Sequence, residues 1–78
     1  MKFFYLAIGD ELLRGESREG NGATLAVYLQ QRGLTLSEVR VLADTPESIA
    51  EALGDLTREK GLVVMSGGLG PTPSPVEM

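Results

Sequence analysis

The 78-residue sequence contains no cysteine, no histidine and no tryptophan. Without cysteine, the chain can form neither a disulfide bond nor a thiolate metal site. Without histidine, it lacks the usual zinc ligand and the imidazole base of Ser-His and Cys-His nucleophile pairs. Any acid–base or metal chemistry must therefore come from carboxylates, and a carboxylate site suits Mg²⁺ or a similar hard ion.

Basic and aromatic residues are also scarce. Seven Lys and Arg stand against eleven Asp and Glu, and only two Phe and two Tyr are present to stack on bases. Because no basic stripe is visible, we expect no nucleic-acid partner. The apolar run at residues 3–8 is too short to span a bilayer or to form the core of a signal peptide. We therefore expect a soluble cytoplasmic protein with no membrane partner.

Three short segments, residues 2–8, 39–42 and 62–66, are rich in residues that favour β-strands. The first of them is almost continuously apolar and does not alternate with polar residues. A continuous apolar run is typical of a strand that is covered on both faces, as in parallel sheets. These segments therefore predict three strands of a parallel sheet.

A helix is predicted between the first two strands. Asn21 is expected to cap its start, the helix runs to about Arg32, and Gly33 stands where a C-terminal cap glycine belongs. The polar segment before it, residues 10–20, is expected to be a loop with one helical turn. The apolar side chains expected to pack on the sheet are those of Leu25, Ala26, Tyr28 and Leu29.

A second helix is predicted from Thr45-Pro46, with Thr as N-cap and Pro at the first helical position, and it is expected to end at Lys60-Gly61. Its apolar face is formed by Ile49, Ala52, Leu53 and Leu56. The order strand, helix, strand, helix, strand predicts an α/β fold with right-handed crossovers. Three strands and two helices leave part of the sheet open, so we expect a homo-oligomer or a partner chain to cover it.

Unusual residues follow each predicted strand, at the ends where ligands bind in open parallel α/β sheets. Gly9, Asp10 and Glu11 follow the first strand, Asp44 follows the second, and the sequence SGGLGPT at 66–72 follows the third. Glycine-rich backbone can present several N–H groups to a phosphate. Asp10, Glu11 and Asp44 can converge on one metal ion or one water molecule.

Each of these features also has a purely structural interpretation. A Gly-Gly-x-Gly segment is commonly a simple turn, and here it lacks the Lys-Ser/Thr of a Walker A loop. Asp10 and Glu11 can serve only as charges in the first turn of a helix, and Asp44 and Asn21 only as helix caps. The gathering of these features at three strand ends favours a binding site over separate structural roles.

Three segments carry a more specific resemblance: AIGDELLRGESREGNGATLAVYLQQRG, VLADTPESIAEAL and LVVMSGGLGPT. Together they resemble the N-terminal domain of the competence/damage-inducible protein CinA, within the molybdopterin-binding, MoCF-biosynthesis-like superfamily. The resemblance implies a three-layer parallel-sheet fold of which this chain, apparently truncated, carries the first β-α-β-α-β portion. Residues 1–72 would form this partial domain, and residues 73–78 a divergent C-terminal tail.

The resemblance also implies a function, namely binding of a nucleotide- or pterin-phosphate ligand in a domain related to metal-dependent ADP-ribose pyrophosphatases. It implies that Mg²⁺ can serve as the cofactor, and it identifies no bound organic cofactor. Carried over by position, Asp10 and Asp44 are the catalytic and metal-binding candidates, and Glu19 stands where the family usually has Asp. The ligand-binding candidates are Gly9, Glu11, Asn21, Ser66, Gly67, Gly68, Gly70 and Thr72.

The sequence departs from the family after Thr72. The family pattern continues with two adjacent aspartates, whereas this chain has Ser74 and Pro75, neither of which supplies a carboxylate. Three functions therefore stay open. They are a Mg²⁺-dependent ADP-ribose pyrophosphatase, a non-catalytic module that binds a nucleotide or molybdopterin through its phosphate, and a self-associating remnant without a ligand.

Overall fold

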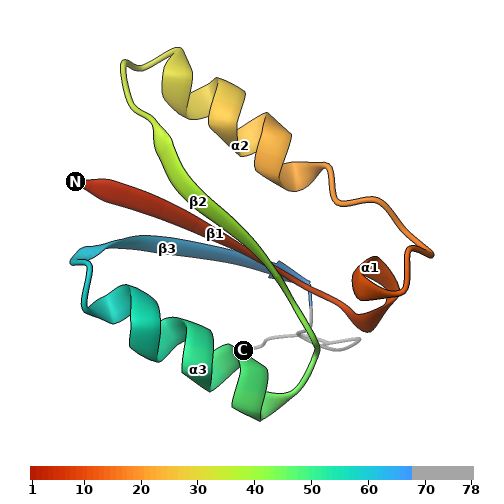
Figure 1. Ribbon diagram of the computed structural model, residues 1–78. Helices are drawn as coiled ribbons and strands as arrows, with labels where there is room; N and C mark the ends of the chain where they lie inside the picture. Colours follow the sequence, from red (N-terminus) through yellow and green to blue (C-terminus); the bar gives the residue numbers. More distant parts are fainter. Residues whose placement is uncertain (68–78) are drawn as a thin grey trace, which may run out of the picture.

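The computed structural model describes residues 1–67, which form a parallel sheet between two helices (Figure 1). The elements are β1 (Lys2–Ile8), α1 (Asp10–Leu13), α2 (Asn21–Gln30), β2 (Leu36–Leu42), α3 (Pro46–Thr57) and β3 (Gly61–Gly67). The strand order is β2-β1-β3, and both pairings are parallel. In Figure 1, α2 lies on one side of the sheet and α3 on the other. The predicted three-layer α/β fold and its order of strands and helices are confirmed.

The central strand β1 is the most buried element of the chain. Its residues 4–8 are each at most 3% exposed. They are buried because β1 has a paired strand on each edge and a helix over each face, which explains why the sequence is apolar without alternation. In the β1–β3 register, Tyr5 pairs with Val64 and Ile8 pairs with Gly67. The carboxyl ends of the two strands therefore lie side by side.

The helix α3 packs its apolar face on the sheet. Phe4 and Leu6 of β1 form a buried cluster with Ala52 and Leu56 of α3. The predicted helix start is confirmed, because the Thr45 hydroxyl accepts a hydrogen bond from the Ser48 amide at 3.2 Å. This bond satisfies one of the backbone donors that a helix start leaves unpaired.

The end of α3 differs from the prediction. The helix stops at Thr57, Lys60 takes a left-handed conformation with φ 57°, and Gly61 is already the first residue of β3. Gly61 is drawn into the sheet because it pairs with Lys2. A Cβ at this position would lie 2.6 Å from the Lys2 carbonyl oxygen, so the close pairing requires glycine.

The helix α2 ends as its glycine predicts, although its apolar stripe is only partly buried. Gly33 has φ 76° and donates to the Gln30 carbonyl, while the next amide bonds to the Leu29 carbonyl at 2.9 Å. These two bonds form a Schellman cap. Leu29 is buried, but Tyr28 is 45% exposed, so its predicted packing on the sheet is wrong. The reason is that α2 packs mainly on β1 and β2, which leaves Tyr28 beside the open surface of β3.

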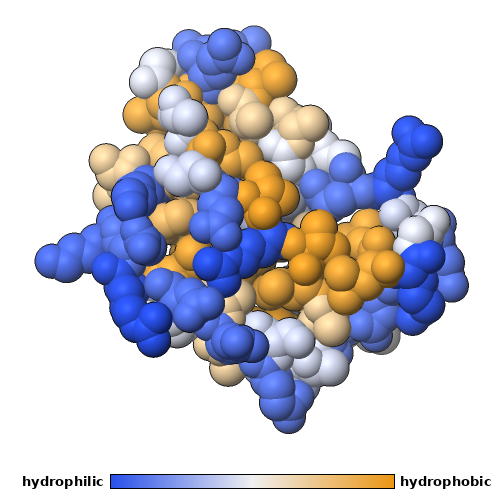
Figure 2. Space-filling model, viewed as in Figure 1, coloured by the Kyte–Doolittle hydropathy of each residue, from blue (hydrophilic) through white to orange (hydrophobic). Residues whose placement is uncertain are grey.

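Part of the sheet surface is not covered by either helix. Val39 and Val41 of β2 and Leu62 and Met65 of β3 are each between 39% and 51% exposed. Figure 2 shows apolar surface in the middle of this view, in the region between α2 and α3. By strand alternation, Met65 lies on the face that α3 covers, whereas Val39, Val41 and Leu62 lie on the face that carries Tyr5. A second chain over either face stays a prediction. Within residues 1–67, no helix is long and apolar enough to cross a membrane.

Gly67 makes the end of β3 sensitive to substitution. It has φ 79°, and a Cβ at this position would lie 2.3 Å from the Ile8 carbonyl oxygen. We expect Gly67→Ala to lower the free energy of unfolding by at least about 2 kcal/mol, through backbone strain and steric overlap. Gly54→Ala is the matched control because a Cβ on this α3 residue meets nothing within 4 Å. It should raise stability by about 0.5–1 kcal/mol. Urea unfolding followed by circular dichroism measures both, and equal effects would contradict the assignment.

Candidate functional site

A cleft opens at the carboxyl ends of β1 and β3. The connection from β1 to β2 passes over one face of the sheet and the connection from β2 to β3 over the other (Figure 1). In open α/β sheets, ligands bind at such a point, where the chain changes direction between neighbouring strands. The cleft has a volume of about 280 Å³. Its polar lining includes Glu11, Arg18, Glu19, Asn21, Ser66 and Gly67.

A hydrogen-bonded group of three side chains joins β1, β3 and the loop before α2 at the edge of this cleft. The Tyr5 hydroxyl donates to Oε2 of Glu19 at 2.9 Å and also bonds to the Ser66 hydroxyl. A tyrosine hydroxyl has one proton, so Ser66 is the donor in its bond with Tyr5. The proton of Ser66 therefore points into the protein, and its lone pairs are the part left for a ligand.

The same carboxylate caps α2. Oε2 of Glu19 accepts from the Asn21 amide at 3.0 Å, and Oε1 accepts from the Gly22 amide at 2.7 Å. Gly20 holds the N-cap position and Asn21 is the first helical residue, so the prediction that Asn21 is the cap is wrong. The physical reason is that the side chain of Glu19, which precedes the helix, reaches forward to the amides of the first turn and takes the role of a cap oxygen.

The electrostatics of Glu19 follow from these contacts. Partial burial raises the pKa of its carboxyl group, and hydrogen bonds from the Gly22 amide, the Tyr5 hydroxyl and the Asn21 amide lower it. The three bonds together outweigh burial, and the pKa lies below its ordinary value. Glu19 is therefore a carboxylate at neutral pH, and its charge faces the positive end of the α2 dipole.

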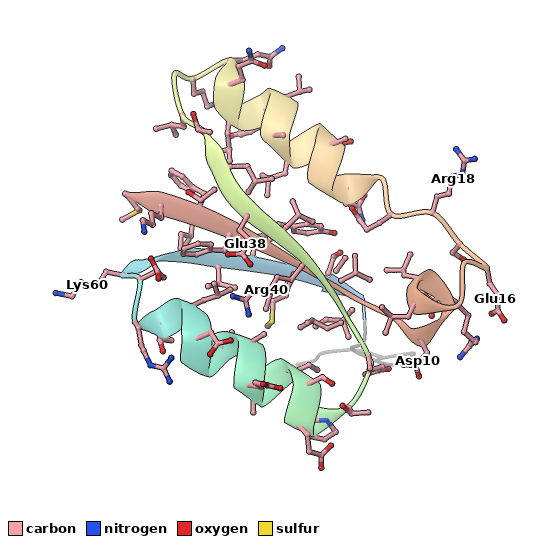
Figure 3. All side chains as sticks on the ribbon, in the orientation of Figure 1. Asp10, Glu16, Arg18, Glu38, Arg40 and Lys60 are labelled. Carbon is pink, nitrogen blue, oxygen red and sulfur yellow. The ribbon has the colours of Figure 1, made fainter. Side chains whose placement is uncertain are left out.

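Asp10 and Asp44, predicted to share a catalytic and metal-binding role, are brought together by a backbone contact. Oδ1 of Asp10 accepts a hydrogen bond from the Asp44 amide at 3.0 Å. Figure 3 shows Asp10 on α1, beside the turn that follows β2. Both residues are exposed. The loop after β1 is thus fastened to the loop after β2.

The donor set at these loops fits Mg²⁺ rather than a fully protein-coordinated metal. In the part of the chain that the structure describes, no three Asp, Glu, His or Cys side chains gather as a metal site. Mg²⁺ is commonly held by one or two carboxylates together with water and phosphate oxygens. Asp10 and Asp44 supply two such carboxylates, so the role predicted for them stays a prediction that this geometry permits.

Glu11 lies on the cleft side of the first loop. It lines the cleft, whereas Asp10 and Asp44 are not among the lining residues. Gly9 is buried, and a Cβ there would lie 2.7 Å from Oε2 of Glu11, so glycine leaves room for this carboxylate to fold back over the backbone.

The predicted catalytic, metal-binding and ligand-binding residues thus fall into three groups. The structure brings Glu11, Asn21, Ser66 and Gly67 together around the cleft, with Gly9 buried next to Glu11. Asp10 and Asp44 form a separate pair next to it. The predictions for Gly68, Gly70 and Thr72 lie outside the described residues.

Sequence reasoning missed the role of Tyr5. It was read only as a strand residue, yet its hydroxyl is the link between Glu19 and Ser66. The sequence feature that could have indicated this role is the single tyrosine within the apolar run of the strand, because a buried tyrosine hydroxyl needs a polar partner. Arg18, which also lines the cleft, was missed because it stands in a polar loop without periodicity.

Comparison with known proteins assigns the family. A family model described as "Probable molybdopterin binding domain" matches residues 4–76. The chain belongs to this molybdopterin-binding domain family.

Relatives of this molybdopterin-binding domain confirm the predicted resemblance to CinA. A CinA-like protein of Deinococcus deserti is 45% identical over 67 residues, which are 86% of this chain and 17% of the relative. A CinA-like protein of Geobacter sulfurreducens is 42% identical over 76 residues, which are 97% of this chain and 18% of the relative. The chain thus spans less than a fifth of the length of either relative.

A solved structure supports the same family fold. The crystal structure of the protein CinA from Thermoplasma acidophilum, described as of unknown function, superposes with a TM-score of 0.80 at 30% identity. The match covers 92% of this chain and 43% of that protein. The sheet and helices described above therefore correspond to part of the fold of that CinA protein.

The contacts of Glu19 make stability depend on pH. Glu19→Gln keeps one acceptor oxygen but replaces the other with an NH₂ group, so we expect it to lose about 1–2 kcal/mol of stability at neutral pH. Because the folded-state pKa of Glu19 is lowered, its contribution is present above the unfolded-state pKa and is lost as the pH falls through the folded-state pKa. Urea unfolding from about pH 7 down to about pH 3 should therefore show the gap between the two proteins closing.

The matched control is Glu51→Gln, which removes a carboxylate from an exposed position on α3. It should change stability by less than about 0.5 kcal/mol at every pH. A gap for Glu19→Gln that stays constant with pH would show that the carboxylate charge contributes nothing to the α2 start.

Proposed function

We propose that the chain binds the phosphate of a nucleotide or a pterin in the cleft at the carboxyl ends of β1 and β3. The observation that carries this proposal is the position of the cleft, which lies at the switch point of the sheet and next to the end of β3. Gly67 ends β3 with φ 79°, a backbone conformation that glycine adopts readily. The sequence continues into Gly68 and Gly70, whose amides are the proposed phosphate donors.

The charged residues of the cleft support a phosphate ligand that is bound by a basic side chain together with a metal ion. Arg18 lines the cleft and takes part in none of the ion pairs found among residues 1–67. Its guanidinium is therefore available for a phosphate. Glu11 adds a negative charge to the same cleft, which opposes a bare phosphate. Bound Mg²⁺ would offset this repulsion by neutralising phosphate charge, and Asp10 and Asp44 would hold it.

Calorimetric titration of the full chain with ADP-ribose and AMP, with and without Mg²⁺, tests the binding proposal. We expect both ligands to bind, and Mg²⁺ to tighten the binding of ADP-ribose by about tenfold. Asp44→Asn should remove the Mg²⁺ effect and leave the binding without metal unchanged. Glu47→Gln, which removes a nearby exposed charge, is the matched control and should keep the Mg²⁺ effect. No binding of either ligand under any of these conditions would refute the proposal.

A second candidate function is hydrolysis of ADP-ribose, and the contact between the Asp10 carboxylate and the Asp44 amide favours it. This contact holds two carboxylate-bearing loops in one place beside the phosphate cleft. In the reaction, water attacks a phosphorus atom of the pyrophosphate, the bridging P–O bond breaks, and AMP and ribose 5-phosphate are released. We propose the Asp44 carboxylate as the base that receives the proton of the attacking water, and Asp10 as the group that orients the Asp44 loop.

Hydrolysis is tested by measuring AMP released from ADP-ribose in the presence of Mg²⁺. Asp44→Asn should lower the rate by about 100-fold or more, since a positioned base contributes on this scale. Asp10→Asn should lower it by a smaller factor, and chelation of the metal should abolish it. A rate that is the same in the wild type and in Asp44→Asn, or tight binding without any turnover, would exclude the enzymatic function while leaving the binding proposal intact.

A further inference from the structure

A second, apolar depression lies beside the polar cleft, between α2 and β3, and is named here the α2–β3 groove. Its volume is about 430 Å³. Tyr5 and Val64 line it from the sheet, and Leu25 and Tyr28 line it from α2. Among residues 1–67, no further element covers it, because α3 packs on the opposite face of the sheet (Figure 1). Apolar and aromatic lining with a few polar groups is the usual character of small-molecule pockets.

The groove and the cleft are continuous. Asn21 and Ser66 line both of them, so the polar cavity at the strand ends and the apolar cavity beside it meet at these two residues. We propose that the groove binds the heterocyclic ring of the ligand whose phosphate occupies the cleft. This inference rests on the proposed function, and it adds the part of the ligand that a phosphate site alone does not specify.

Tyr28 is held in an orientation suited to such a ring. The guanidinium carbon of Arg32 lies 3.6 Å from the centroid of the Tyr28 ring, and Nη1 of Arg32 donates to the Tyr28 carbonyl at 3.0 Å. Arg32 thereby covers one face of the aromatic ring and restrains the side chain. The rest of the ring borders the groove, where it offers an aromatic surface for a flat heterocycle.

Two of the four hydroxyl-bearing residues that line the groove, Ser66 and Thr24, are placed to accept hydrogen bonds from a ligand. The Ser66 hydroxyl donates a hydrogen bond to the Tyr5 hydroxyl, which donates to Glu19, and the Thr24 hydroxyl donates to the Gly20 carbonyl at 3.3 Å. The hydroxyls of Ser66 and Thr24 therefore offer lone pairs to a ligand, because their protons are used within the protein. A ring with an exocyclic amine, which adenine and pterin both carry, can donate to these lone pairs. A ring with a carbonyl in the same place would face them with another acceptor.

The test compares three ligands by calorimetric titration of the full chain: AMP, IMP and ribose 5-phosphate. Ribose 5-phosphate carries the phosphate without a ring, and IMP carries a purine with a carbonyl in place of the amine of AMP. We expect AMP to bind about tenfold more tightly than ribose 5-phosphate through ring stacking. We expect it to bind about three- to tenfold more tightly than IMP through the hydrogen bond.

Tyr28→Ala should bring the affinity for AMP down to that for ribose 5-phosphate without changing the latter. Val27→Ala is the matched control, because Val27 is a neighbouring residue of α2 that is 53% exposed and does not line the groove. Ser66→Ala should abolish the preference for AMP over IMP, while the bond from Tyr5 to Glu19 remains to hold the fold.

The outcomes separate this inference from the phosphate proposal. If ribose 5-phosphate and AMP bind equally well, or if Tyr28→Ala leaves AMP binding unchanged, the groove does not hold the ring although the phosphate site stands. If none of the three ligands binds, the phosphate proposal itself fails. If AMP and IMP bind equally, or if their difference survives in Ser66→Ala, the assigned role of Ser66 is wrong.

Discussion

The Glu19 carboxylate is the interaction on which the geometry of the cleft depends. It accepts one hydrogen bond from the hydroxyl of Tyr5 on the central strand and two from the first amides of α2. Through Tyr5 it also reaches Ser66 on β3. One ionised group therefore fixes the start of a helix relative to two strands, and a charge-assisted hydrogen bond is stronger than a neutral one. Within the described chain, all its contacts come from secondary-structure elements that border the cleft.

This arrangement also limits how the site can bind an anion. The start of a helix commonly binds phosphate through its free amides. Here the amides of Asn21 and Gly22 are already bonded to Glu19, so α2 has little to offer a phosphate at its first turn. In the proposed binding mode, the phosphate would instead contact the end of β3, Arg18 and a metal ion held by the neighbouring loops. The Glu19 carboxylate thus occupies the anion-binding position at the start of α2, which leaves the end of β3 as the proposed place for a phosphate.

The sequence specifies the fold more fully than it specifies the site. The alternation of apolar segments fixed the strand and helix order, and local chemistry predicted the Thr45 cap and the Gly33 terminus correctly. The strands β2 and β3 were predicted too short, because pairing with β1 rather than intrinsic preference determines where they begin. The exposure of Tyr28 could not be predicted, since helical periodicity identifies an apolar face but not how far the neighbouring sheet extends beneath it. The Tyr5–Glu19–Ser66 contacts join positions 61 residues apart at most, and no local pattern encodes them.

The two carboxylate roles in this chain are physically separate, which bears on how binding and catalysis relate. Glu19 serves structure, because its oxygens are used by α2 and Tyr5, and its lowered pKa keeps it ionised there. Asp10 and Asp44 stand on loops that a single backbone bond joins, outside the lining of the cleft. A ligand in the cleft would therefore meet these two aspartates through the metal ion that they are proposed to hold. Since Ser74 and Pro75 add no carboxylate, the proposed hydrolysis would rest on the Asp10–Asp44 pair.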